Sequence, residues 1–462
     1  MKARNIIVLT ALLLVSCYGF GQEVQNFSLR EAQEYALKNS AEVKNTKIDN
    51  EIAKKKIWET TAIGLPQISG TVNYQHQFKV PEMNFGGSSF LKLDPTVPAG
   101  TPLTSDMVGN TLTLGTNPGQ PIKLGLMDNT TMDVTVSQLV FNGGYIVGLQ
   151  AARVYYQIAD QNYQKSQIDI KESIANTYSL ILIVENNRTV LQRSLDNITK
   201  TLSEMRQINK QGLNEDTDVD QIELTSLNIT NAINTITRQI EASYDLLKFQ
   251  MGIPLEKKIT LTDSLDGLIA NVDLATLVGK QFNIQSNITY KIMDTQEAFG
   301  KLALRKEISN SLPSIAAFYK HTEKLNQAAF DFTPKDILGL SVNVPLFSSG
   351  QRNVMVKQRR LDLEKITNSK NKAIEGVKLD YTNSKNELNS TFEKYLNEKK
   401  NIELTKRIYD KTMIKFREGI SSSLDLTQVH NQYLTAQSNF FTAAYNLLTA
   451  KNKLDKIVNN DL

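Results

Sequence analysis

Two long stretches without glycine or proline constrain the fold of this chain most. The first runs from Leu149 to Gln211 and the second from Leu213 to Met251. Glycine weakens a helix and proline breaks one, so their absence over such lengths indicates continuous helix. Apolar residues recur with coiled-coil spacing at Leu191, Leu195, Ile198, Leu202 and Met205 and at Ile222, Ile229, Ile233, Ile236, Ile240 and Leu247. The sequence therefore predicts a long helical hairpin that turns at Gly212.

The same hairpin pattern occurs a second time. The stretch from Gln351 to Arg417 contains one glycine, Gly376, and no proline, and Gly419 then occupies the place of Gly212. The returning stretch carries apolar or small residues in the same rhythm at Val429, Tyr433, Ala436, Phe440, Ala443, Leu447, Ala450, Leu454 and Ile457. A repeat of about 200 residues indicates a tandem duplication and not a solenoid of short units.

Each repeat also contains two segments with the two-residue period of a β-strand. In the first repeat these segments run from Gln67 to Val80 and from Met132 to Val140. In the second they run from Ser314 to Thr322 and from Leu338 to Leu346. Four strands of about ten residues with one apolar and one polar face suit a transmembrane β-barrel. A soluble four-stranded sheet packed on a core would have the same pattern.

Barrel closure favours an assembly of several chains. Four strands cannot close a barrel, and an open edge in lipid would leave backbone groups without hydrogen bonds. Two chains would supply eight strands and a filled bore, whereas three would supply twelve and leave room for a channel. In such a barrel we expect Val342 and Val344 to face lipid, and Ser341 and Asn343 to face the lumen.

The remaining segments predict connecting helices and loops. Ser28 and Glu31 form a capping box that opens a helix, which we expect to run without a break to Ile63. The segment from Pro81 to Asn129 is rich in proline, glycine, threonine and serine and predicts a loop. A helix is expected from Leu274 to Ser311. Pro345 should lie at a strand end, because proline cannot donate to the ladder.

The N-terminus has the pattern of an export signal. Lys2 and Arg4 precede an apolar run, and small residues at 19–21 suit cleavage, which predicts a signal peptide over residues 1–21. Alternatively, Cys17 follows a lipobox-like segment and becomes a lipidated N-terminus. Cys17 is the only cysteine, so neither interpretation leaves a disulfide in the mature fold.

Composition gives little support to an enzyme or a nucleic-acid-binding protein. The formal net charge is +4, too balanced for a nucleic-acid partner. The three histidines, His76, His321 and His430, lie far apart in the sequence, and no motif has metal-ligand spacing. We therefore expect no catalytic site, no metal and no cofactor.

The sequence resembles the TolC family of bacterial outer-membrane efflux proteins. The likeness covers nearly the whole mature chain and depends on the order and spacing of short motifs. These motifs are Ser28-Leu29-x-x-Ala32 with Ala36-Leu37, Leu65-Pro66, Met251-Gly252-Ile253-Pro254, Leu312-Pro313, Phe347-Ser348-Ser349-Gly350-Gln351-Arg352, and Gly419 with Asp425.

The resemblance implies a mainly α fold with a transmembrane β part. Each protomer of a homotrimer would give four strands to a 12-stranded β-barrel in outer-membrane lipid and long coiled-coil hairpins to a periplasmic α-barrel. The function implied is a passive exit duct, for efflux or type I secretion, coupled through a periplasmic adaptor (a membrane fusion protein) to an inner-membrane pump. The repeats are assigned to 22–253 (β-hairpin about 67–141, helical hairpin 145–251) and 274–462 (β-hairpin about 314–347, helical hairpin 351–457), joined by an equatorial connector, 254–273.

The first hairpin tip carries an acidic cluster of Glu215, Asp216, Asp218 and Asp220. Helix capping and attraction of carboxylates to the positive helix end explain Glu215 and Asp216 as well as a functional role does.

The resemblance implies that an acidic residue six positions after the tip glycine of the second repeat, and another three later, narrow the periplasmic entrance. Asp425 occupies the first position and Gln428 the second, with Asp218 and Gln221 as the first-repeat counterparts. We therefore predict an incomplete acidic ring.

The hairpin tips are also candidates for contact with an adaptor. A glycine lets another backbone approach closely, and an exposed aliphatic neighbour adds apolar contact. These residues are Gly212, Leu213, Gly419 and Ile420. The alternative function is that of a periplasmic adaptor or a structural coiled-coil protein. An adaptor usually has one hairpin flanked by small β domains, so two hairpins and two strand pairs argue against it.

Overall fold

The computed structural model describes residues 24–84, 89–93, 102, 112–116, 121–123, 125–212, 214–270, 272, 279, 282–326, 331 and 333–458. The expected signal peptide, Cys17 and Leu213 lie outside these residues. The chain forms two compact units. A helical unit comprises Met1–Ile57, Ala151–Leu304 and Lys357–Leu462, and a β unit comprises Trp58–Gln150 and Arg305–Val356.

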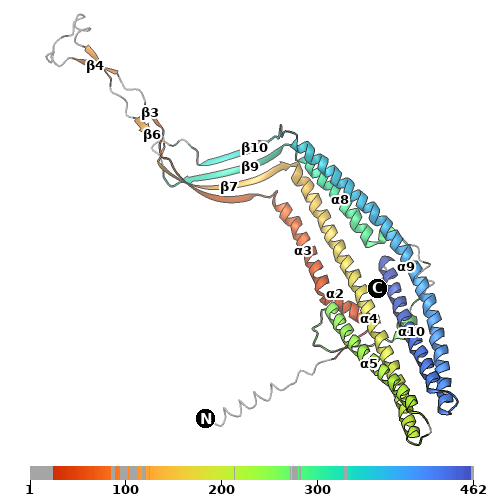
Figure 1. Cartoon of the computed structure of the whole chain (residues 1–462). Helices are drawn as coiled ribbons and strands as arrows, with labels where there is room; N and C mark the ends of the chain where they lie inside the picture. Colours follow the sequence, from red (N-terminus) through yellow and green to blue (C-terminus); the bar gives the residue numbers. More distant parts are fainter. Residues whose placement is uncertain are drawn as a thin grey trace, which may run out of the picture. The chain divides into compact units, whose positions relative to one another are not determined.

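Four long helices dominate the helical unit (Figure 1). They are α4 (Gly143–Asn209), α5 (Asp216–Met251), α9 (Gln351–Arg417) and α10 (Ser423–Val458). Helices α4 and α9 have 67 residues each, and α5 and α10 have 36 each. The equal lengths support the internal duplication, and the predicted long helices are confirmed.

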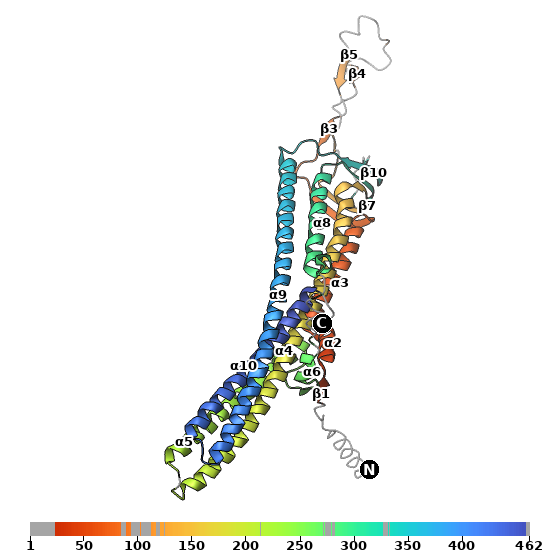
Figure 2. The same ribbon diagram turned by 90° about the vertical axis from the view of Figure 1, so that its right-hand side faces the viewer.

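The predicted seams form the core of the helical unit. One cluster of buried residues joins all four long helices, with Ile198 on α4, Ile229 on α5, Met413 on α9 and Leu426 on α10. Figure 2 shows the two hairpins lying side by side toward their tips. The coiled-coil spacing in the sequence therefore identified the buried face of α4, α5 and α10.

Polar contacts also cross between the two hairpins inside this unit. The Ser194 hydroxyl on α4 hydrogen-bonds His430 Nε2 on α10 at 2.8 Å. Gln437 donates to Asn187 at 2.7 Å, and Asn452 donates to Asn176 at 2.9 Å. Because buried polar groups need partners, these contacts fix the register of α10 against α4.

A small two-stranded sheet ties the chain's N-terminal segment to the connector. Strand β1 (Gln25–Phe27) pairs in parallel with β8 (Ile259–Leu261), near the short helix α6 (Leu265–Ala270). The fully buried Tyr178 on α4 donates its hydroxyl to the Phe27 carbonyl at 2.9 Å. The capping box is confirmed, because Ser28 and Glu31 exchange both hydrogen bonds at the start of α2 (Leu29–Asn39).

Three expectations about connecting segments were wrong. The first helix breaks at Ser40, whose extended backbone separates α2 from α3 (Ala41–Ala62). The later helix is not continuous, because a 3-10 turn at Ile284–Ser286 (η1) precedes α8 (Ile288–Ser309), where the Asn287 side chain caps the helix by accepting from the Thr289 amide. The expected start near Leu274 lies outside the described residues. The expected loop contains short paired strands, β3 (Glu82–Asn84) with β6 (Pro121–Lys123) and β4 (Ser89–Leu93) with β5 (Leu112–Thr116).

The β unit is built on one antiparallel sheet of four strands in the order β10-β9-β7-β2. Its strands are β2 (Gln67–His76), β7 (Asp128–Asn142), β9 (Ser314–Lys324) and β10 (Asp336–Asn343). The predicted strand segments are therefore present, although β10 ends before Val344. Pro345 lies beyond that end, as expected for a residue that cannot donate to the ladder.

His430 makes the stability of the helical unit sensitive to acid. Its ring is fully buried, and burial lowers the pKa of His430 to about 4, because a charged imidazolium is poorly solvated in the core. In the unfolded chain histidine titrates near about 6.5, so that state takes up the proton first. The contribution of neutral His430 to the free energy of unfolding is fully present above about pH 6.5. It is lost as pH falls toward about 4, and the loss is roughly 3 kcal/mol at most.

We predict that His430→Gln reduces the loss of thermal stability between neutral pH and about pH 4. Thermal melting followed by far-ultraviolet circular dichroism measures this difference. His76→Gln is the matched control, because the His76 side chain is 43% exposed. An acid-induced loss of the same size in His430→Gln and in the parent would contradict the assignment.

Candidate functional site

Both hairpin tips turn at a glycine with a left-handed backbone. The φ angle is 73° at Gly212 and 72° at Gly419, and a Cβ at either position would meet nothing within 4 Å. At the second tip, the Ile420 amide donates to the Lys415 carbonyl and the Gly419 amide to the Phe416 carbonyl. This pair of bonds is the Schellman termination of a helix, so the turn itself requires Gly419. Ile420 is 74% exposed.

Asp425 caps its own helix. Its Oδ2 accepts from the Ser422 amide at 3.2 Å and from the Ser421 hydroxyl at 3.3 Å, and the Asp425 amide donates to the Ser422 hydroxyl at 3.1 Å. The hydrogen bonds from Ser422 hold the pKa of Asp425 below its usual range. The exposed carboxylate is therefore charged at neutral pH, and capping is one role that the geometry gives it.

Asp218 has a different environment from its counterpart. It is half-buried, and its Oδ1 accepts a hydrogen bond from the buried Ser423 hydroxyl of the second hairpin. The structure therefore brings Asp218 to the first residue of α10, where it joins the two tips of one protomer. Sequence analysis did not foresee this link, because it depends on how the hairpins pack.

The other acidic residues of the first tip do not act as a group. Glu215 is the N-cap residue of α5 but makes no side-chain cap bond, and it accepts from the Thr217 hydroxyl at 3.2 Å. Asp216 accepts from Asn209 at 2.9 Å, whereas Asp220 is exposed. Within the described part of the chain, no group of histidine, cysteine and acidic residues is suited to a metal ion.

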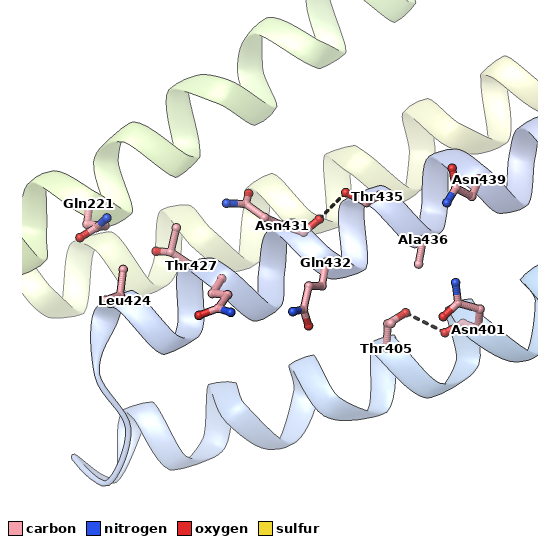
Figure 3. Close-up of a pocket in the computed structure, with 11 residues that line it drawn as sticks. Gln221, Asn401, Thr405, Leu424, Thr427, Asn431, Gln432, Thr435, Ala436 and Asn439 are labelled. Atoms are coloured by element: carbon pink, nitrogen blue, oxygen red, sulfur yellow. Dashed lines mark hydrogen bonds between the residues drawn. The ribbon is translucent and has the colours of Figure 1, made fainter.

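Gln221 and Gln428 lie together in a groove above the tips (Figure 3). The groove has a volume of about 730 Å³ and is lined by α9, α10 and Gln221 of α5. Most of the lining side chains are amides or hydroxyls, and none is charged. The lining comprises Gln221, Asn401, Thr405, Leu424, Thr427, Gln428, Asn431, Gln432, Thr435, Ala436 and Asn439.

The sheet of the β unit has one apolar face that is exposed. Strand register places Val72 opposite Met132 and Ala317 opposite Leu340. Leu338 is 82% and Leu340 is 71% exposed, so no described element of the protomer covers these two side chains. Large apolar residues exposed on this face are Ile68, Val72, Tyr74, Met132, Val134, Tyr319, Leu338, Leu340 and Val342. So extensive an exposed apolar surface marks a site of contact with lipid or protein.

The opposite face of the sheet is polar and carries a hydrogen-bonded network. Asp133 Oδ1 accepts from the Thr322 hydroxyl at 2.7 Å, and its Oδ2 lies 3.1 Å from Lys320 Nζ. Ser341 and Asn343 belong to this face, one residue out of phase with Val342. The two faces are thus as different as the sequence alternation predicted.

Each strand pair also carries a cluster of tyrosine, histidine and aspartate that sequence analysis missed. Asp128 Oδ1 lies 2.7 Å from the Tyr74 hydroxyl and 2.8 Å from His76 Nδ1. Asp336 Oδ1 lies 2.7 Å from both the Tyr319 hydroxyl and His321 Nδ1. The signal in the sequence was Tyr-x-His in both repeats, but only strand register brings an aspartate opposite each histidine.

Comparison with known proteins gives one family and one fold. Residues 309–460 match the model of the outer membrane efflux protein family. No curated protein sequence matches the chain. The outer membrane protein VceC of Vibrio cholerae has a similar structure over 93% of this chain and 95% of its own, with 13% identity and a TM-score of 0.68.

Two outer membrane channels show the same similarity. CmeC of Campylobacter jejuni matches 93% of this chain and 85% of its own, with 14% identity and a TM-score of 0.71. MtrE of Neisseria gonorrhoeae matches 93% and 88%, with 13% identity and a TM-score of 0.69. The resemblance to the TolC family is confirmed, by sequence over 309–460 and by fold over nearly the whole chain. No helix among the described residues is long and apolar enough to cross a membrane.

The tip geometry generates a prediction about ion selectivity. If Asp218 and Asp425 repeat around one axis, their charges attract cations into the entrance and disfavour anions. We expect the double variant Asp218→Asn with Asp425→Asn to show reduced cation selectivity and reduced block by divalent ions in planar-bilayer recordings. Ser423→Ala is the control, because it removes the link to Asp218 and leaves both charges. Unchanged selectivity in the double variant would assign both carboxylates to tip structure alone.

Proposed function

We propose that the protein is the outer-membrane exit duct of a tripartite efflux or type I secretion system. The observation that carries this proposal is the four-stranded sheet with one exposed apolar face and one polar face. The match to the outer membrane efflux protein family and the channel fold support the same function. A passive duct needs no catalytic site, and its driving force would come from a partner pump.

A homotrimer is the assembly that suits this sheet. The end strands β2 and β10 leave backbone groups unpaired, which lipid does not tolerate. Three copies would supply twelve strands and leave an open bore, in which the polar face with Asp133 and Lys320 would line the lumen. The long helical hairpins of the three copies would then form the periplasmic part of the duct.

The limits of the apolar face agree with a membrane span. From Ile68 to Tyr74 the strand extends by about 20 Å, comparable with the apolar band of about 25 Å in outer-membrane barrels. The face ends at the clusters around Asp128 and Asp336, and a carboxylate is unfavourable in the hydrocarbon region. We therefore place both clusters at the boundary between lipid and water.

Substitution on the two faces of β10 tests the membrane proposal. Val342→Arg should destabilise the inserted barrel by about 2–4 kcal/mol if the site is near the midplane of the bilayer. Ser341→Arg, one residue away, should leave stability nearly unchanged and alter conductance. Urea unfolding in lipid vesicles and single-channel recording measure the two effects. Equal tolerance of arginine on both faces would indicate a soluble sheet.

The hairpin tips are proposed to contact a periplasmic adaptor, with Gly212, Leu213, Gly419 and Ile420 as the contact residues. Space around the tip glycines and the exposure of Ile420 support this role. A bulky residue at Gly419 would also strain the left-handed turn, by about 1–2 kcal/mol. Ile420 is therefore the better position for a test, because its side chain is exposed and its backbone keeps the turn.

We expect Ile420→Glu to abolish efflux in cells while the assembled protein stays in the membrane, because a charge at the tip opposes apolar docking. Drug accumulation and the amount of assembled protein in outer-membrane fractions are the two measurements. Leu379→Glu is the control for loss of an exposed apolar side chain, because Leu379 is also exposed but lies on α9 far from the tip. Efflux at the parental level in Ile420→Glu would remove the tip from the adaptor interface.

A further inference from the structure

We propose that the groove above the tips binds an extended polypeptide segment through its backbone, so that the cargo of the duct includes unfolded polypeptide. The inference rests on the proposed function, because it takes the groove to lie on the path of the duct's cargo. The inference is argued from the spacing and the chemistry of the groove's side chains, and from the larger number of amides that α10 contributes compared with α5.

The spacing of polar side chains in the groove resembles that of an extended chain. Helix α10 presents two rows of residues at four-residue intervals, and successive members of a row rise by about 6 Å. Equivalent peptide groups of an extended chain recur every second residue, at about 6.6 Å. The span from Leu424 to Asn439 is about 22 Å and accommodates roughly seven extended residues. The rows are Thr427, Asn431, Thr435 and Asn439, and Leu424, Gln428, Gln432 and Ala436.

The chemistry of the lining suits a neutral ligand that both donates and accepts hydrogen bonds. A carboxamide has both functions and pairs with the N–H and C=O of a peptide group. Gln428, Gln432 and Asn439 are exposed, and their amides bond to no other side chain in the described part of the chain. A charged ligand would lose hydration here without gaining a countercharge, because no lining residue is charged.

The amide rows are not a requirement of the hairpin fold. Counting from each tip glycine, α5 has the same length as α10 but lacks an amide at three of the four positions where α10 lines the groove with one. Leu224, Thr225 and Ala232 on α5 correspond to Asn431, Gln432 and Asn439 on α10, whereas Gln221 corresponds to Gln428. Because the duplicated helix folds without them, the amides of α10 are available for a ligand.

Both walls of the groove contribute to the same arrangement (Figure 3). Asn401 and Thr405 repeat the four-residue interval on α9, and Gln221 of α5 lies on the other side. The Thr405 hydroxyl donates to the Asn401 carbonyl at 2.9 Å, and the Thr435 hydroxyl donates to the Asn431 carbonyl at 2.8 Å. These hydroxyls keep their lone pairs for a peptide N–H, so a bound chain would meet acceptors on both walls.

Binding of an uncharged peptide to the assembled full-length protein in detergent tests the proposal. The probe is a fluorescent peptide of about eight serine, glycine and asparagine residues with both ends capped, measured by fluorescence anisotropy. We expect the groove variant Asn431→Leu with Gln432→Met to weaken binding by about tenfold or more. The matched control, Asn228→Leu with Gln239→Met, removes two exposed amides of α5 and should bind as the parent does.

Three results would overturn the peptide site. They are equal binding by the groove variant and the parent, equal competition by polyethylene glycol of the same length, and no binding to the assembled parent. Current block by the same peptide in planar bilayers separates this site from the duct function. A parent that forms no pore but shows groove-dependent binding overturns the duct and retains the peptide site. A pore with peptide block that is equal in the groove variant overturns the peptide site and retains the duct.

Discussion

The unpaired edges of the four-stranded sheet are the constraint on which the rest of the structure depends. Strands β2 and β10 each have a neighbour on one side only, and the sheet exposes large apolar residues such as Leu338 and Leu340. In lipid, both features require that the sheet continue into other copies of the chain. In the proposed homotrimer the helices must assemble around the same axis as the sheet, and duplicated hairpins of equal length suit that arrangement.

Buried polar contacts give the helical unit specificity that its apolar seams cannot supply. Leucine and isoleucine at coiled-coil positions bury area, but they accept several registers at similar free energy. His430 and Gln437 each have one partner on α4, so sliding α10 by one turn would leave both without hydrogen bonds. The same reasoning explains the Asp218–Ser423 link, which aligns the two tips of a protomer.

Periodicity in the sequence predicted the long helices and the strand faces, because each follows from the repeat of apolar residues along one element. Periodicity did not predict the contacts between different elements. The Tyr-x-His pairs were visible as residues, but their aspartates lie across the strand ladder. The break at Ser40 was missed because no glycine or proline marks it, and the N-terminal segment forms a sheet with the connector that only the folded chain shows. Short strands within 81–129 were missed since that segment is rich in proline and glycine.

The duplication separates structural roles from functional ones at the tips. Asp218 and Asp425 occupy equivalent positions, yet Asp425 caps α10 and Asp218 bonds to the other hairpin. A residue kept only for capping would cap both helices, so the different partners show that the two copies have diverged in use. Gln221 and Gln428, also equivalent, converge on one groove. The second hairpin lines this groove with five amides and the first with Gln221 alone, which is expected if one face of a duplicated pair contacts cargo while the other supports the assembly.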